Sequence, residues 1–185
     1  MEEIELYAYH VVTDRPLKVG QQLLFDETHH NGVYQRVCDK INIVEEIYSN
    51  PEKYSAETLE HHTSVAMRDL ALEEVRKKKY PTYPSRMSCL YVSRTFEEAD
   101  NWGKYFAKIG RPTYSIVKLE IKGNCFYGDA TKCFDAQLDE QENMRLAEIY
   151  WKNESNDADD PPIVEMLVDG HIKVVEMIKE INANI

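Results

Sequence analysis

The predicted strands of this 185-residue chain lie near its two ends, and this arrangement limits the folds open to it. A strand rich in Tyr and Val is expected over residues 5–13, and two apolar runs, residues 163–168 and 171–178, flank the dipeptide Asp169-Gly170. An Asp-Gly pair between apolar runs is a strong signal for a β-hairpin. Because helices lie together between the strands instead of alternating with them, we predict an α+β fold. Its sheet should be mainly antiparallel or mixed, with helices packed around it.

Helical spacing of apolar residues marks the middle of the chain. One helix is expected over residues 36–48, and Ser55 is the expected N-cap of a long helix that ends near Lys79. Another helix is expected over residues 138–151. No internal repeat, low-complexity segment or linker interrupts these elements, so residues 1–185 are predicted to form a single domain.

The segment from residue 89 to residue 121 carries the clearest local signals. Residues 89–93 are predicted to form a short apolar strand. Thr95 followed by Glu98 is a capping box, which predicts a helix that Gly110 ends. A further strand is expected over residues 113–121, where apolar side chains alternate.

Composition and missing motifs exclude several function classes. The net charge of −11 and the pI near 5.0 argue against sequence-independent binding to nucleic acid. No signal peptide is expected, and no apolar run approaches the roughly 18 residues of a transmembrane helix. We therefore expect a soluble, cytoplasmic protein that does not bind a membrane. The sequence contains neither a Gly-rich phosphate loop nor a His-Glu-x-x-His motif, and its four cysteines have no Cys-x-x-Cys spacing. No metal site is expected.

Glu165 is the residue that structure alone explains least. It interrupts an apolar run, with Ile163-Val164 before it and Met166-Leu167-Val168 after it. Burial of a carboxylate in such a strand costs several kcal/mol unless the carboxylate has a partner. Glu165 is therefore the first candidate for a functional residue.

Three segments together resemble the ADP-ribosyltransferase superfamily, in the branch with a His-Tyr-Glu motif. They look closest to small bacterial members once catalogued only as domains of unknown function, and they share features with relatives that act on DNA or tRNA. The segments are Tyr9-His10-Val11-Val12-Thr13, then Leu90-Tyr91-Val92-Ser93 with Trp102 in the helix that follows, and Glu165-Met166-Leu167-Val168-Asp169-Gly170. Their order and spacing agree with the family, and the resemblance spans most of the chain.

The resemblance implies an NAD site and a role for each matching residue. His10 would be a fixed hydrogen-bond donor to the adenosine ribose, and Thr13 is the nearby hydroxyl, three residues on where the family usually has it two residues on. Tyr91 would stack on the nicotinamide ring and Trp102 would cover the other face of that ring. Glu165 would stabilise the oxocarbenium-like ribose as the nicotinamide bond breaks.

Other interpretations of the same residues stay open at this point. The leading hypothesis is an NAD-dependent mono-ADP-ribosyltransferase with an unknown acceptor, which could be a protein, a nucleic acid or a small molecule. The alternatives are an NAD glycohydrolase, an RNA 2′-phosphotransferase, or a non-catalytic interaction module with the same fold. His10, Tyr91 and Trp102 could equally be ordinary half-buried or core residues. Arg36 and Arg86 could contact a pyrophosphate or form salt bridges.

Overall fold

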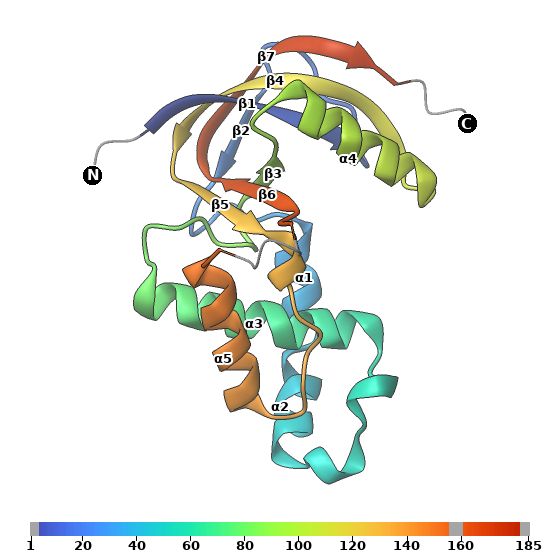
Figure 1. Cartoon of the computed structure of the whole chain (residues 1–185), viewed down its shortest axis with the longest axis vertical. Coiled ribbons are helices and arrows are strands. Elements are labelled where there is room, and N and C mark those ends of the chain that lie inside the picture. The colour runs from blue at the N-terminus through green and yellow to red at the C-terminus, as the bar shows by residue number, and fades with distance from the viewer. Residues whose placement is uncertain (1–3, 156–160, 182–185) are drawn as a thin grey trace. The chain divides into compact units, whose positions relative to one another are not determined.

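The described residues, 4–155 and 161–181, of the computed structural model contain two sheets, five α-helices and three short 3-10 helices (Figure 1). The helices are α1 (Gly32–Cys38), α2 (Ile41–Ser49), α3 (His61–Lys79), α4 (Phe96–Lys108) and α5 (Glu140–Lys152). The strands are β1 (Ile4–Thr13), β2 (Gln22–Phe25), β3 (Leu90–Val92), β4 (Thr113–Gly123), β5 (Cys125–Asp129), β6 (Val164–Val168) and β7 (Gly170–Glu180). The pairs β1–β4, β4–β7, β2–β7 and β3–β6 are antiparallel. The predicted α+β class is confirmed.

The chain divides into two compact units, and neither unit is continuous in the sequence. The first comprises the described residues of Met1–His29, Leu90–Tyr127 and Glu165–Ile185, and the second those of His30–Cys89 and Gly128–Val164. The first unit holds the four-stranded sheet, with strand order β1-β4-β7-β2, together with α4 and most of the three-stranded sheet, with order β3-β6-β5. The second unit holds the other four helices. The single-domain assignment stays a prediction.

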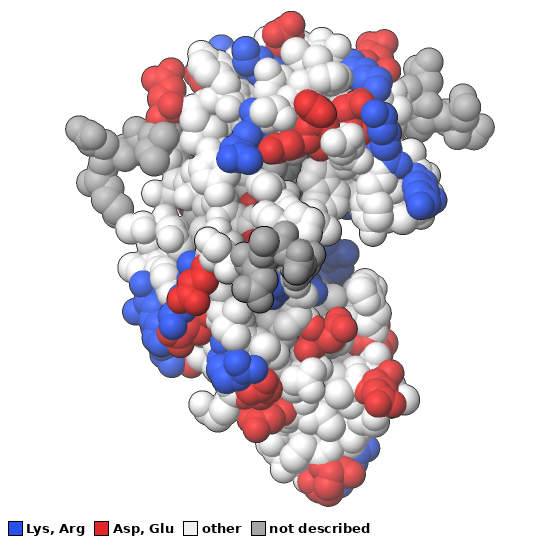
Figure 2. All heavy atoms as spheres, viewed as in Figure 1, with Lys and Arg blue, Asp and Glu red and all other residues white. Residues whose placement is uncertain are grey.

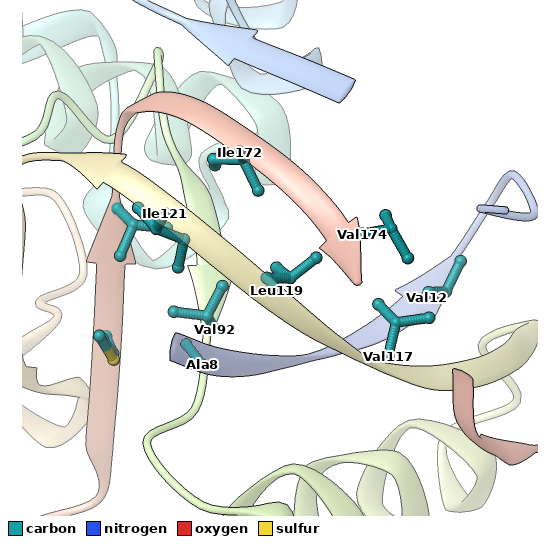
Figure 3. Packing of buried hydrophobic residues seen from close by; sticks show 10 residues of the cluster. Ala8, Val12, Val92, Val117, Leu119, Ile121, Ile172 and Val174 are labelled. Carbon is teal, nitrogen blue, oxygen red and sulfur yellow. The ribbon is translucent and has the colours of Figure 1, made fainter. Parts of the chain in front are cut away.

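One face of the four-stranded sheet forms the core of the first unit. Side chains alternate across a strand, so Ala8 and Val12 of β1 point to the same face and are 0% and 1% exposed. They pack with alternate residues of β4 and β7 and with Val92 of β3 (Figure 3). The labelled cluster consists of Ala8, Val12, Val92, Val117, Leu119, Ile121, Ile172 and Val174.

Helix α4 packs against the opposite face of β1 and β4. Ala99 is buried in a cluster with Val11 and Ile116. The helix begins after Thr95 because the Thr95 hydroxyl accepts the N–H of Glu98 at 3.2 Å, as the capping box predicts. The Glu98 carboxylate accepts the N–H of Arg94 at 3.1 Å, one residue earlier than the motif predicts. The local signal therefore located this helix start correctly and misplaced only the second bond of the box.

The predicted C-terminal hairpin is wrong in its pairing. Strands β6 and β7 form where expected, but β6 pairs with β3 in one sheet and β7 pairs with β4 and β2 in the other. Asp169 and Gly170 lie where the chain passes from one sheet to the other, and Gly170 has a φ of +81°. A Cβ atom on Gly170 would stand 2.3 Å from the carbonyl oxygen of Lys122. The glycine is therefore required by close backbone approach, which an Asp-Gly signal does not distinguish from a turn.

The helix predicted over residues 36–48 is two helices, α1 and α2, separated at Asp39 and Lys40. Val37 of α1 and Val44 and Ile47 of α2 are buried in the same cluster. The apolar spacing continues across the break because both helices contribute to one core, which explains why the sequence suggested a single helix.

The N-cap predicted at Ser55 is also wrong. Helix α3 begins at His61, and Glu60 is its N-cap, with a carboxylate that accepts the N–H groups of His62 and Thr63. A longer acidic side chain thus takes the role that Ser, Thr, Asp and Asn usually have. Helix α3 ends at Lys79, as predicted, and α5 begins two residues later than expected, after the cap residue Asp139.

A buried ion pair stabilises the second unit. Arg86 Nε donates to Asp69 Oδ1 at 3.1 Å, and Arg86 Nη1 donates to the Tyr150 hydroxyl at 2.8 Å. The side chains of Arg86 and Asp69 are 8% and 3% exposed. Arg86 therefore has structural partners. The other arginine considered for a pyrophosphate, Arg36, donates through Nε to the carbonyl oxygen of Gly32 at 3.0 Å.

Charged residues are mixed over the visible surface. On the face shown in Figure 2, the described Lys and Arg side chains lie among Asp and Glu side chains. None of the helices in residues 4–155 and 161–181 is long and apolar enough to span a bilayer.

Candidate functional site

His10 is fixed to the backbone of a neighbouring strand. It lies on β1 opposite Val117 of β4, and its Nδ1 atom is 2.8 Å from the carbonyl oxygen of Tyr91 on β3. A carbonyl oxygen can only accept, so the hydrogen must be on Nδ1. In a neutral imidazole the second nitrogen, Nε2, is then an acceptor. The ring therefore offers an acceptor to a ligand at neutral pH, where the sequence predicted a fixed donor.

The surroundings of His10 keep its imidazole neutral. Desolvation by the packed protein lowers the pKa of His10 from 6.5 to about 4, the donated bond to the Tyr91 carbonyl opposes this change, and the positive charge of Arg111 lowers the pKa further. Its neighbours on the same face of β1, Ala8 and Val12, are fully buried, whereas His10 retains partial solvent access. A neutral, oriented and partly accessible imidazole is suited to binding a hydroxyl group.

Tyr91 and Glu165 lie on adjacent strands and share one face of the three-stranded sheet. Tyr91 pairs with Leu167 of β6, and opposite residues of an antiparallel pair point to the same side. Glu165 precedes Leu167 by two residues and therefore points to that side as well. The Tyr91 residue is 36% exposed and Glu165 is half-buried. The structure thus places an accessible aromatic ring and a carboxylate on the same face.

The side chain of His10 belongs to the other side of that sheet. His10 shares the face of β1 on which Ala8 and Val12 pack with Val92 and Met166, whose side chains point away from the face of Tyr91. The contact between His10 and β3 is therefore to the backbone of Tyr91 and not to its ring. The three residues of the predicted motif come together as neighbours on β1, β3 and β6, at the point where β1 meets β3.

This meeting point is a single β-bridge between Tyr9 and Ser93. The N–H of Tyr9 donates to the carbonyl oxygen of Ser93 at 2.9 Å, and the N–H of Ser93 donates to that of Tyr9 at 2.7 Å. The register of β3 with β6 ends at the pair Val92–Met166, and Ser93 and Glu165 are the next residues beyond it. The bridge explains why His10, next to Tyr9, reaches the backbone of Tyr91.

Trp102 and Thr13 are not brought into this arrangement. Trp102 packs with Val11 and Phe106 on the face of β1 opposite to that of His10. Its ring stacks on Phe106, with centroids 5.8 Å apart. Thr13 follows a register irregularity between Val12 and Thr13 at the end of β1. The helical spacing that identified Trp102 is the spacing of a residue that packs against the sheet.

Sequence reasoning did not single out Arg94, which follows the bridge directly. Its Nη2 atom donates to Glu98 Oε1 at 3.2 Å, and its Cζ atom lies 5.5 Å from the ring centroid of Tyr127 on β5. The sequence signal was weak, because Tyr127 lies 33 positions from Arg94 and β5 was not predicted.

Among the described residues, no group of three or more His, Cys, Asp and Glu side chains is arranged to hold a metal ion. His29, of the pair His29-His30, has its Nδ1 atom 2.8 Å from Asp26 Oδ1. His30 has its Nδ1 atom 2.6 Å from the Ser88 hydroxyl. The two adjacent histidines thus contact different partners.

Comparison with known proteins gives a family without an assigned activity. A family model described as "Protein of unknown function (DUF2441)" matches residues 8–180, a range that includes His10, Tyr91 and Glu165. The search of curated proteins found no match for the chain.

Proposed function

We propose that this chain, which belongs to the DUF2441 family of proteins of unknown function, cleaves the nicotinamide–ribose bond of NAD and transfers ADP-ribose to an acceptor. The observation that carries the proposal is the hydrogen bond from His10 to the backbone of Tyr91, on the strand that pairs with the strand of Glu165. His10, Tyr91 and Glu165, the residues on which the resemblance to ADP-ribosyltransferases rests, are thus on neighbouring strands. The resemblance to ADP-ribosyltransferases supplies the substrate.

In the proposed reaction the bond between C1′ of the ribose and the nicotinamide nitrogen breaks, and its electron pair leaves with nicotinamide. The acceptor nucleophile forms the new bond to C1′ and loses a proton. Positive charge develops on the ribose before the new bond forms, and the Glu165 carboxylate stabilises this charge and bonds a ribose hydroxyl. The accessible ring of Tyr91, on the same face as Glu165, stacks on nicotinamide.

His10 has a binding role in this proposal. Its Nδ1–H is used by the Tyr91 carbonyl, so Nε2 accepts a hydrogen bond from a hydroxyl of the adenosine ribose. With a pKa of about 4, the ring stays neutral and keeps this acceptor at neutral pH. Trp102 has no part in the site, because it packs on the other face of β1.

The test follows nicotinamide release and NAD binding in wild type and Glu165→Gln. The variant keeps the shape of the side chain but removes its charge and replaces one acceptor oxygen with an NH2 donor, so release should fall by roughly 10²–10³-fold, as when a preorganised electrostatic group is lost. The dissociation constant of NAD should change little, because the interaction forms mainly in the transition state. Glu176→Gln is the matched control, because Glu176 is an exposed glutamate on β7.

Wild type that binds no NAD and releases no nicotinamide contradicts the proposal. Wild type that binds NAD without turnover, at the same affinity as Glu165→Gln, supports a second candidate, a non-catalytic binding module. The placement of Trp102 favours that candidate, because the nicotinamide would then be covered on one face by Tyr91 alone.

A further inference from the structure

Arg94 is held in place by three contacts at the bridge between β1 and β3. Its N–H donates to Glu98 Oε2 at 3.1 Å and its Nη2 donates to Glu98 Oε1 at 3.2 Å, so backbone and side chain are bound to one carboxylate. Its guanidinium lies over the ring of Tyr127, with Cζ 5.5 Å from the ring centroid. Long side chains usually lose considerable rotamer entropy when they bind a ligand. Arg94 is already oriented, so less entropy remains to be lost.

The position of Arg94 relates it to His10. Arg94 follows Ser93, which pairs with Tyr9, the residue before His10. Cys125 of β5 packs against the cluster that contains Val92, and Tyr127, two residues on in the same strand, points to the same side. The Arg94 guanidinium lies over the Tyr127 ring and so is on the side to which His10 points. A cation and the Nε2 acceptor of His10 therefore lie on the same side of β3.

The guanidinium of Arg94 still has donors to offer. Its side chain is 51% exposed, and its Nε and Nη1 atoms form no hydrogen bond with a described residue. An arginine fork binds the oxygens of phosphate groups through two parallel bonds, which a lysine cannot reproduce. Tyr127 beneath it is 45% exposed, so the stacked pair is open to solvent.

We propose that Arg94, stacked on Tyr127 and oriented by Glu98, binds the diphosphate of the dinucleotide whose adenosine ribose His10 holds. This inference rests on the proposed function for the identity of the ligand. The chain carries a net charge of −11, so a diphosphate needs a local cation to approach this surface. Arg94 supplies that cation at a fixed position.

The experiment measures binding of ADP and of adenosine by calorimetry. The variants are Arg94→Gln, which removes the charge, and Arg94→Lys, which keeps the charge and loses the fork. Arg145→Gln is the matched control, because Arg145 also pairs with a glutamate, Glu142, on its own helix and is similarly exposed at 58%. Circular dichroism and the melting temperature show whether each variant is folded.

Arg94→Gln should weaken ADP binding by roughly 10- to 100-fold, as expected for lost charge-assisted hydrogen bonds, and leave adenosine binding unchanged. Arg94→Lys should recover part of the loss, and Arg145→Gln should behave as wild type. Wild-type affinity for ADP in a folded Arg94→Gln variant overturns the inference, as does a wild type that binds ADP no better than adenosine.

The proposed function is judged separately, by nicotinamide release from wild type. Release that persists unchanged in Arg94→Gln, with an unchanged KM for NAD, leaves the proposed function intact and removes Arg94 from the site. If ADP binding depends on Arg94 but wild type releases no nicotinamide, the diphosphate site is supported and the proposed reaction is rejected.

Discussion

The neutral state of His10 makes a quantitative prediction about stability and pH. The pKa of His10 is lowered from 6.5 to about 4 on folding, mainly because the packed protein desolvates the imidazole. As pH falls below 6.5, His10 binds a proton in the unfolded chain but not in the folded chain. The free energy of unfolding therefore falls as the pH is lowered from 6.5 to 4. Above pH 6.5, His10 does not contribute to the dependence of this free energy on pH.

The magnitude follows from the two pKa values. A difference of one pKa unit corresponds to about 1.4 kcal/mol, so the full change is about 3 kcal/mol, of which about 2.5 kcal/mol is lost by pH 4.5. Many carboxylates also titrate in this range, so wild type alone does not isolate the histidine. His10→Asn provides the comparison, because its amide can donate to the Tyr91 carbonyl but does not titrate.

The assay is urea unfolding of both proteins at pH 7.5 and pH 4.5 with a common slope m. Wild type should lose about 2.5 kcal/mol more than His10→Asn between the two values. A loss of the same size in both proteins would refute the reasoning, because it would mean that the folded chain accepts the proton. The statement that the packed protein keeps the imidazole neutral below pH 6.5 would then fail, whereas the Nδ1–H assignment, which rests on the bond to the Tyr91 carbonyl, would not.

Two further predictions concern residues that stabilise the two units. Gly170→Ala should destabilise the protein by several kcal/mol, because φ is +81° and the new Cβ would lie 2.3 Å from a carbonyl oxygen of β4. Gly110→Ala is the control: φ is +77° there, but no atom lies within 4 Å of the new Cβ, so the cost should be only about 1–2 kcal/mol. Equal losses in urea unfolding would contradict the close approach. Arg86→Met should cost about 3 kcal/mol, because it removes the closer cation of the buried Asp69 carboxylate and leaves only the longer contact with Arg68 Nη2 at 3.5 Å, and the double variant Arg86→Met/Asp69→Leu should be more stable than the single one. A double variant no more stable than Arg86→Met would reject that reasoning.

The elements that sequence predicted well are those set by local chemistry. The Thr95 hydroxyl caps α4 as expected, and Gly110 follows its end with a positive φ. Strand β1 spans Ile4–Thr13 where a strand was predicted over residues 5–13. Each of these elements is determined by backbone groups within a few residues of the signal, so the local sequence is enough to predict it.

The failures concern partners distant in the sequence. The Asp169-Gly170 signal correctly indicated a glycine conformation, but β6 and β7 pair with β3 and β4 instead of with each other. The side chain of Asp169 accepts the N–H of Asn124 at 2.8 Å, so this dipeptide is bound to the β4–β5 connection. Nothing in the local pattern separates a tight hairpin from a crossing between sheets, because both need a residue with positive φ.

The same distinction between local features and distant partners applies to the candidate site. The sequence identified Glu165 because a carboxylate in an apolar run is anomalous, and the structure places it two residues from Leu167, the partner of Tyr91. It could not identify what holds His10, because that partner is a backbone carbonyl oxygen, which no residue type specifies.

Whether an aromatic residue belongs to such a site depends on which face of a strand it reaches. Trp102 and His10 are both associated with β1, yet Trp102 packs against Val11 while His10 points the other way, since adjacent residues of a strand face opposite sides. A motif defined only by the order of residues along the chain does not say to which face of a strand each side chain points. Arg94 shows the converse: the sequence did not single it out, but its guanidinium lies over Tyr127 of β5, on the side of the three-stranded sheet to which His10 points. The faces can be assigned only once the pairing of the strands is known: Tyr91 and Glu165 share one face of the three-stranded sheet, and the His10 side chain points to the other.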